Sequence, residues 1–329
     1  MKGIILEKPG GEYLLSDSVA KPTPGKNQIL VKSLVTGLNP VEGIQQQGML
    51  VTAWPIVLGC DASGIVVAVG EDVKKFKQGD GVFGCTRLGE PGYGTFQEYF
   101  LMDEHITFKT PANITSVQAA TIGVGLLTAS MGLVSGTKMP LEAQPQKSAE
   151  DSEWVVIFGA AGSVGQYGVQ LVEGLGADAT LSHRIPVAEQ LQGIATITGG
   201  KFSRVFDASA MAGDTGMQAL ADQSSISDSA KYFTTTNDWA PVEPRKGVEI
   251  HLITLGLIGK SGGVSEETVN KDIETYIPKL EQFLESGVVK PNEYEQVGDI
   301  GVEEVLKGLG AFKTRKNDGK KLVVRVSAD

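Results

Sequence analysis

The chain has few of the residues that hold metal ions or build disulfide frameworks. Among its 329 residues are two cysteines, Cys60 and Cys85, and three histidines. The cysteines do not form a CxxC pair, and none of the histidines has partners at the spacing of metal ligands. The sequence therefore argues against a disulfide framework and a thiolate zinc cluster, and it predicts a reducing, cytoplasmic setting.

Long apolar runs and an excess of positive charge are also missing. No apolar run reaches the length that crosses a bilayer, so we expect no membrane partner. The net charge of −10 disfavours binding to nucleic acid or to an anionic membrane surface. A small anion can still bind, because helix ends act at short range. Residues 1–7 meet a charge and then Pro-Gly, which predicts a first strand rather than a signal peptide.

The apolar fraction of 41% is enough for two domains with buried cores. Up to about Thr121 the sequence is rich in turns and short apolar segments, as in 29–35, 64–70 and 78–84. This pattern predicts a compact β-barrel or sandwich. Residues 320–326 predict a last strand, which we expect to return to this first half and make the first domain discontinuous.

The pattern changes after Pro111. Apolar residues at helical spacing predict a helix over 116–130 that crosses into a second domain. Residues 137–152 are polar and contain two prolines, which predicts a surface excursion. The apolar run 153–158 is typical of a central parallel strand. Near the C-terminus a helical stripe covers 269–284, and Pro278 inside it predicts a kink or a break.

A glycine-rich loop, Gly159-Ala160-Ala161-Gly162-Ser163-Val164-Gly165, follows the 153–158 strand and precedes an amphipathic helix up to Leu175. Small residues let the backbone approach a pyrophosphate, and the positive end of the helix attracts it. A tight turn between strand and helix is the alternative interpretation. The flanking strand and helix favour dinucleotide binding.

At these residues the chain resembles the medium-chain dehydrogenase/reductase superfamily, in its zinc-free quinone-reductase and enoyl-reductase branch. Within the branch it is most similar to the fungal trans-acting enoyl reductases and their "zinc-binding dehydrogenase" relatives. The resemblance rests on segments 37–41, 58–64, 79–84, 94–99, 126–129, 159–165 and 318–323. It implies an α/β chain with a GroES-like β-barrel catalytic domain over 1–121 and 258–329. A Rossmann domain with a doubly wound parallel sheet would cover 122–257.

The resemblance also implies which residues contact the cofactor or the substrate. Asn39, Pro40 and Val41 would lie near the nicotinamide and its ribose, and Asp318 and Gly319 would approach it from the last loop. Thr128 would line the cleft as the candidate catalytic residue, and Gly162, Ser163, Val164 and Gly165 would hold the pyrophosphate. The alternatives are a helix hydroxyl bonded to its own backbone for Thr128 and a simple turn for Asn39-Pro40.

Zinc enzymes of the superfamily have a cysteine where Asn39 stands and a histidine where Cys60 stands. The resemblance therefore implies no catalytic zinc, and Cys60 is expected to be a buried small thiol. Enoyl-reductase relatives also have a lysine at the position of Ile44, so that residue's role cannot be transferred. We interpret the nearby Glu42 and Gln45 as parts of a solvated turn.

The second domain departs from the resemblance in its length. Roughly 25 residues, a strand and a helix that normally bind the 2′-phosphate of NADPH, are absent after the glycine-loop helix. We hypothesise that segment 177–182 takes the place of the missing strand. Ser182, His183 and Arg184 would then meet the adenosine ribose, and Arg184 would favour a 2′-phosphate and hence NADPH. An exposed loop is the alternative, and so is a deletion or faulty splicing that abolishes cofactor binding.

The sequence leaves three functions open. The first is an NADPH-dependent oxidoreductase that transfers hydride to an enone, an enoyl thioester or a quinone, with a proton from solvent, Thr128 or Tyr93. The second is a cofactor-poor relative that binds a small apolar ligand or catalyses a non-redox step. The third is a subunit that acts in trans on a carrier-bound substrate. We expect a small-molecule substrate, either free or bound to a carrier, and a monomer or a homodimer joined through strand 248–253.

Overall fold

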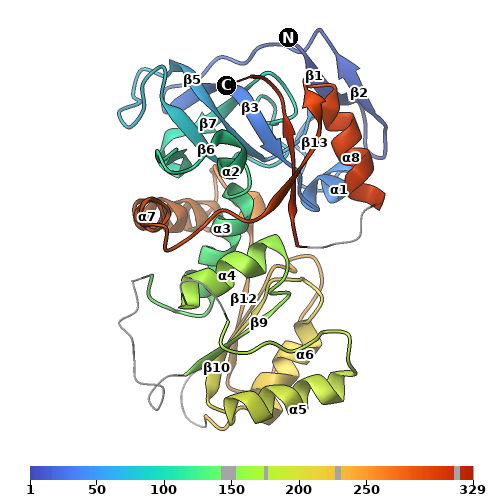
Figure 1. Ribbon diagram of the computed structural model, residues 1–329, viewed down its shortest axis with the longest axis vertical. Coiled ribbons are helices and arrows are strands. Elements are labelled where there is room, and N and C mark those ends of the chain that lie inside the picture. The colour runs from blue at the N-terminus through green and yellow to red at the C-terminus, as the bar shows by residue number, and fades with distance from the viewer. Residues whose placement is uncertain (142–152, 174–176, 227–230, 315–318, 329) are drawn as a thin grey trace. The chain divides into compact units, whose positions relative to one another are not determined.

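The computed structural model describes residues 1–141, 153–173, 177–226, 231–314 and 319–328 (Figure 1). The chain divides into two compact units. Unit 1 comprises Met1–Val124, Leu255–Glu285 and Pro291–Asp329, and unit 2 comprises Gly125–Thr254 and Ser286–Lys290. Unit 1 is mainly β-structure, and unit 2 has a parallel sheet between helices. The predicted fold class is therefore confirmed.

Unit 1 has two β-sheets. The larger has seven strands in the order β13-β14-β3-β5-β6-β8, with β7 also pairing with β3, and the smaller has the order β2-β1-β4. The strands are β1 (Gly3–Leu6), β2 (Tyr13–Ser16), β3 (Gln28–Gly37), β4 (Ile56–Val57), β5 (Asp61–Val69), β6 (Gly81–Cys85), β7 (Tyr99–Asp103), β8 (Phe108–Lys109), β13 (Tyr294–Ile300) and β14 (Lys321–Arg325). Because β14 pairs with β3, the predicted return of the last strand to the first half is confirmed.

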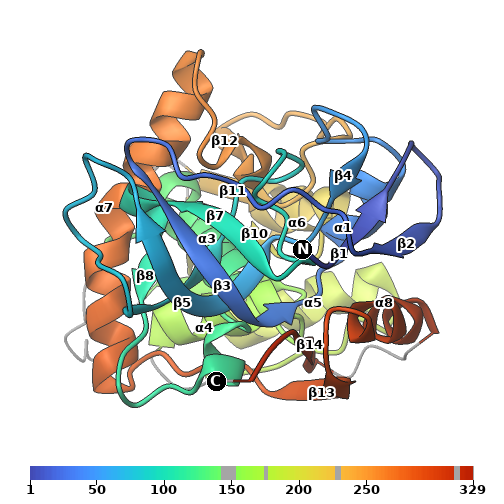
Figure 2. The same ribbon diagram turned by 90° about the horizontal axis from the view of Figure 1, so that it is seen from above.

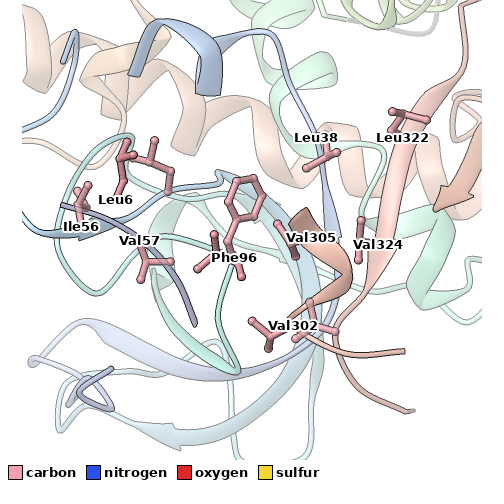
Figure 3. Close-up of a cluster of buried hydrophobic side chains, with 12 residues drawn as sticks. Leu6, Leu38, Ile56, Val57, Phe96, Val302, Val305, Leu322 and Val324 are labelled. Atoms are coloured by element: carbon pink, nitrogen blue, oxygen red, sulfur yellow. The ribbon is translucent and has the colours of Figure 1, made fainter. Parts of the chain in front are cut away.

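The short strands of unit 1 surround an apolar core. Figure 3 shows side chains from β1, β4, β14 and α8 (Glu304–Thr314) gathered in one cluster. Phe96 is fully buried at its centre, and Leu322 and Val324 of β14 join it. Figure 2 shows α8 beside β13 and β14. This packing anchors the C-terminal strand, which also supplies a polar residue to the site described below.

The helices of unit 1 differ from the predictions at two places. The stripe over 116–130 forms two helices, α2 (Ser116–Ala119) and α3 (Gly123–Ser130), instead of one. The sequence predicted a kink or a break at Pro278. Helix α7 (Val264–Ser286) continues through Pro278, so no break occurs there. Its buried stripe, which includes Ile277 and Leu280, packs on both sides of the proline and offsets the lost hydrogen bond. The remaining elements are α1 (Val41–Gln46), η1 (Glu104–Ile106) and η4 (Leu255–Leu257).

Unit 2 has a four-stranded parallel sheet in the order β12-β11-β10-β9. The strands are β9 (Trp154–Phe158), β10 (Phe202–Asp207), β11 (Lys231–Thr235) and β12 (Val248–Leu252). The helices are η2 (Met131–Gly136), α4 (Ser163–Glu173), α5 (Val187–Thr198), α6 (Gly213–Gln218) and η3 (Ala219–Gln223). Helices α5 and α6 pack on one face of the sheet. In the part of the chain that the structure describes, none of the helices has the length and apolarity to cross a bilayer.

Strand β9 lies at one edge of this sheet. In a Rossmann sheet of order 3-2-1-4-5-6, the strand before the glycine loop is central. All five residues of β9 are only half-buried, whereas β10 is almost fully buried. Residues 177–182 form no strand and are exposed, so the hypothesis that they replace the missing strand is wrong. Ala177, Asp178 and Ala179 favour strands poorly, which gives the segment little reason to extend the sheet.

The edge position of β9 predicts uneven protection of the sheet from hydrogen exchange. We expect the amides of β9 to exchange at least about tenfold faster than those of β11, which has a neighbour on both sides. Hydrogen–deuterium exchange of the two peptides, followed by mass spectrometry, measures this difference. Equal protection would mean that another segment or a second chain covers the edge of β9.

Candidate functional site

The glycine loop of unit 2 connects β9 to α4, and its three glycines are required for different reasons. Gly159 has a φ of +74°, and a Cβ there would come within 2.8 Å of the Cβ of Ser209. A Cβ on Gly165 would lie 2.3 Å from the carbonyl oxygen of Gly159. Gly162 differs, because a Cβ there would meet only that carbonyl oxygen, at 3.4 Å. Two glycines thus close the loop, and the third leaves open space in front of it.

The start of α4 faces the same loop. The helical hydrogen bonds begin with the bond from Gln166 N to Gly162 O, at 2.9 Å. The first N–H groups of a helix have no partner inside it, and they carry the positive end of the helix dipole. Gly162 has no side chain and Ser163 has a short one, so a phosphate can approach these groups. The loop therefore fits the pyrophosphate of a dinucleotide.

Unit 1 contains a buried polar cluster that we call the Lys321 cluster. It lies where α1, β5, β6 and β14 begin or end. Its members are Asn39, Glu42, Cys60, Asp61, Cys85 and Lys321, all of them buried. A buried charge is costly unless it is paired, so the partners of these groups decide what the cluster can do.

Lys321 and Asp61 form the ion pair at the centre of the cluster. The Nζ of Lys321 lies 2.7 Å from Asp61 Oδ2 and also donates to Asn39 Oδ1. The side-chain nitrogen of Asn39, Nδ2, donates to Asp61 Oδ2 at 3.2 Å and to Glu42 Oε1 at 3.3 Å. The Cys60 thiol donates to Glu42 Oε1 at 3.5 Å. The side chain of Asn39 therefore points inward and links both carboxyl groups.

Glu42 is the second carboxyl group of the cluster. Burial raises its pKa from the ordinary value of 4.5 to about 7, and Asp61 adds to the increase, although Lys321 and Asn39 oppose it. The ammonium ion of Lys321 bonds to Asp61, so Glu42 gains little compensation for a negative charge. The pKa of Glu42 therefore lies near neutral pH, and its carboxyl group is mainly protonated at pH 5. The interpretation of Glu42 and Gln45 as a solvated turn is wrong, because both lie buried in α1.

The two cysteines are buried side by side, as expected for Cys60. A hydrogen bond to Cys85, burial and the charges of Glu42 and Asp61 raise the pKa of Cys60 well above its usual range. Burial also raises the pKa of Cys85. A thiol is a nucleophile or a metal ligand only as a thiolate, so neither cysteine is prepared for that chemistry. Among the described residues, no group of three or more His, Cys, Asp or Glu could hold a metal ion.

The comparisons with known proteins cover both units. The model of the alcohol dehydrogenase GroES-like domain matches residues 25–112. A zinc-type alcohol dehydrogenase-like protein of Schizosaccharomyces pombe is 27% identical over 360 residues, which cover 99% of this chain and all of the relative. Trans-enoyl reductase RAP2 of Pyricularia oryzae is 26% identical over 351 residues, with 97% of each chain covered. These matches support the predicted resemblance to the medium-chain dehydrogenase/reductase superfamily.

Further comparisons agree with this resemblance. Quinone-oxidoreductase QR1 of Triphysaria versicolor is 30% identical over 207 residues, 56% of this chain and 60% of the relative. An alcohol dehydrogenase superfamily protein from Novosphingobium aromaticivorans has a TM-score of 0.78 at 21% identity, with 99% of this chain and 100% of that chain covered. A mycobacterial protein solved with NADPH has a TM-score of 0.71 at 19% identity, with 99% of both chains covered. At these identities the two structures show the fold alone.

The alignment with the S. pombe relative also allows the lengths of the two chains to be compared. Its alignment runs over 360 residues, more than the 329 of this chain, so the alignment opens gaps opposite this chain. The edge position of β9 among the described residues agrees with a chain that is shorter than its relative in this part of the sheet.

The structure places the other predicted site residues as follows. Pro40 and Val41 begin α1 in unit 1, directly after the buried Asn39. Gly319 precedes β14 with a φ of +84°, and Asp318 lies outside the described residues. Thr128 is a buried residue of α3. Each unit thus contains part of the predicted site.

Ser182, His183 and Arg184 are all exposed, in an irregular segment before α5. The backbone N–H of Arg184 donates to Ser182 Oγ at 3.2 Å, which closes a local turn. The carbonyl of His183 accepts a hydrogen bond from Gln190. The segment therefore leaves the imidazole and guanidinium groups on the surface of unit 2.

Tyr93 is a poor source of the proton for a reduction. Its hydroxyl donates to Asp103 Oδ1 at 3.0 Å and accepts from Gln28, and Arg87 holds the same carboxylate with two hydrogen bonds of 2.7 Å. Burial and the charge of Asp103 raise the pKa of Tyr93 far above its usual range. These bonds make the hydroxyl a structural link, which argues against Tyr93 as the source of the proton.

The sequence analysis missed Lys321 and Asp61 as members of a site. Both lie in segments that carry the resemblance, but they were not assigned a role. A signal was present, because Lys321 begins a strand of four further residues that include Leu322, Val323 and Val324. A lysine at the start of a buried strand needs an acidic partner, and Asp61 begins another buried strand.

Proposed function

We propose that the protein is a zinc-independent oxidoreductase that uses NADPH to reduce a conjugated carbonyl compound, an enone, an enoyl thioester or a quinone. The single observation that carries the proposal is the glycine loop of unit 2. Gly162 leaves open space before the start of α4, as a pyrophosphate requires. Relatives named as an enoyl reductase and a quinone oxidoreductase support the reaction class.

Residues of both units would hold the cofactor. Gly162, Ser163, Val164 and Gly165 would bind the pyrophosphate through backbone N–H groups. Asn39 turns its side chain into the Lys321 cluster, so segment 39–41 would meet the nicotinamide through its backbone and through Pro40 and Val41. Asp318 and Gly319 would approach from the last loop. When bound, the cofactor supplies the hydride, and the protein contributes orientation and a dry environment.

Thr128 remains the proposed catalytic residue. It lies in α3 and is 5% exposed. Its hydroxyl would hold the carbonyl oxygen of the substrate, where negative charge develops during conjugate reduction. Because Tyr93 is engaged with Asp103, the proton would come from solvent or from this hydroxyl.

Two features support independence from zinc. The positions at which zinc relatives have a cysteine and a histidine are Asn39 and Cys60 here, and both side chains bond within the Lys321 cluster. The cation in this cluster is the ammonium ion of Lys321.

One observation favours a second candidate function. Strand β9 lies at the edge of its sheet, and the strands that support adenosine in a Rossmann domain have no counterpart beside it among the described residues. A relative that binds cofactor poorly, and instead holds a small apolar ligand or catalyses a non-redox step, would agree with this sheet. We propose small-molecule substrates in either case, free or carrier-bound. We also propose a cytoplasmic monomer or homodimer.

Titration with NADPH and NADH distinguishes the two functions. We expect NADPH to bind more tightly, because Arg184 can pair with the 2′-phosphate. Arg184→Ala is expected to lower NADPH affinity about tenfold and to leave NADH affinity unchanged. Isothermal calorimetry measures both, and Arg245→Ala, at another exposed arginine of unit 2, serves as the control. If neither nucleotide binds, the reductase proposal fails and the ligand search moves to non-redox compounds.

A further inference from the structure

The Lys321 cluster contains a buried ion pair whose groups come from distant parts of the chain. The side chain of Lys321 is 4% exposed and that of Asp61 is fully buried. Taking both charges out of water costs much of what their attraction returns, so the pair is a weak source of stability. The hydrogen bonds around it therefore point to a role in geometry rather than in stability alone.

Two glycines next to the ion pair leave the space that the side chains of Lys321 and Asp61 occupy. A Cβ on Gly37 would lie 3.0 Å from Lys321 Cε and 2.5 Å from the carbonyl oxygen of Ala120. A Cβ on Gly123 would lie 2.5 Å from Asp61 Oδ1. The glycines at the end of β3 and the start of α3 thus permit close approach of the backbone to the ion pair. Larger residues at either position would displace it.

The hydrogen bonds of the ion pair connect four segments of unit 1. Asp61 Oδ1 accepts from the N–H of Val124, at 2.6 Å, and so binds the start of α3. Asp61 Oδ2 and Lys321 hold opposite ends of the Asn39 amide. Lys321 itself follows Gly319 by two residues at the start of β14. The ammonium ion therefore links segment 39–41 to the loop at 319, and its partner Asp61 adds the start of α3.

We propose that Lys321 is a positioning residue for the nucleotide site. It sets the Asn39 amide with its oxygen toward the ammonium ion and its nitrogen toward Asp61, and thereby places segment 39–41 relative to the loop at Gly319. This inference rests on the proposed function, because these segments are the ones expected to meet the nicotinamide. Lys321 itself does not touch the cofactor in this role.

Two variants distinguish a positioning role of Lys321 from a role in stability: one removes only the charge of Lys321, and the other removes the charges of both Lys321 and Asp61. Lys321→Met leaves the carboxylate of Asp61 buried without its cation, so the melting temperature should fall. The double variant Asp61→Asn/Lys321→Met is neutral and should recover most of that loss. In the double variant, however, the new amide nitrogen faces Asn39, so the Asn39 amide must reverse. Nucleotide affinity should then remain low although stability returns.

The experiment measures the melting temperature and the NADPH dissociation constant of the full chain and its variants. Lys320→Met, a substitution at the exposed neighbouring lysine, is the matched control and should change neither value. We expect both the single and the double variant to bind NADPH at least about tenfold more weakly, which corresponds to about 1.4 kcal/mol. Recovery of both stability and affinity in the double variant would show a structural role only and would overturn the inference.

Two further results complete the test. If the double variant does not regain stability, Asn39→Ser decides, since it keeps both charges and removes only the amide that they hold. Wild-type affinity in Asn39→Ser would also overturn the inference. If the wild-type chain binds neither NADPH nor NADH, the proposed function itself fails. If instead the wild-type chain binds NADPH tightly and the variants bind it equally well, only the inference about Lys321 fails.

Discussion

Replacing Glu42 by glutamine is expected to change the free energy of unfolding more favourably at pH 8 than at pH 5, by about 2.5 kcal/mol. Glutamine has nearly the shape of the protonated acid, and its side-chain oxygen can accept the hydrogen bond from the backbone of Asn39. Its NH2 group would then face Asn39 Nδ2 and Cys60 Sγ, which both donate to Glu42 Oε1, so these two hydrogen bonds are lost at every pH. The substitution also removes the buried negative charge, and this second effect is the one that depends on pH. Chemical denaturation at a series of pH values measures the difference.

The sign of this effect follows from the pKa of Glu42. Burial raises that pKa from 4.5 in an ordinary glutamate to about 7 in the folded chain. Between these two pH values the folded chain keeps the proton and the unfolded chain releases it. Stability from this group is therefore fully present below pH 4.5, falls as the pH rises, and reaches its minimum above pH 7. The glutamine variant should lack this decrease.

The control is Glu7→Gln, since Glu7 is exposed. It should reproduce the pH dependence of the wild-type chain. If the Glu42 variant showed the same slope as the wild type between pH 5 and pH 8, Glu42 would not carry the proton that we assign to it.

The sequence predicted elements where a pattern is local. Strands β3, β5, β9 and β14 follow from continuous apolar runs between turn residues, and α4 follows from its spacing after the glycine loop. The segment at 177–182 was predicted from spacing to Gly165 alone. Spacing does not tell whether a strand finds a partner, and alanine and aspartate give it little tendency to extend. Helix α7 shows the converse, because tertiary packing keeps Pro278 inside it.

The candidate site divides in the same way. Local sequence indicated the glycine loop, since strand, loop and helix are contiguous. The Lys321 cluster depends on contacts across 260 positions between Asp61 and Lys321 and 282 between Asn39 and Lys321. Glu42 was interpreted as part of a solvated turn, yet it is buried beside Asp61 and Lys321, which lie far from it along the chain. Burial of a polar side chain is a property of the fold, which a local pattern does not contain.

The glycine loop allows a matched pair of substitutions with opposite expected effects. A Cβ on Gly165 would meet the backbone of Gly159 and Ala160 at 2.3 and 2.6 Å, and neither atom can move without opening the loop. A Cβ on Gly162 would contact only the carbonyl oxygen of Gly159, at 3.4 Å. Its φ is outside the left-handed range, so alanine fits the backbone there. Gly165 is therefore needed for the fold of the loop, and Gly162 is needed for ligand binding.

We expect Gly165→Ala to destabilise unit 2 by several kcal/mol, because the loop must shift to admit a methyl group. Gly162→Ala should leave the melting temperature unchanged or slightly higher, since alanine reduces the entropy of the unfolded chain. Its methyl group would occupy the space before α4, so NADPH affinity should fall at least about tenfold. Thermal denaturation and calorimetric titration of both variants measure these effects. Wild-type affinity in Gly162→Ala would mean that the pyrophosphate does not lie at this loop, and the proposed reductase function would lose its main support.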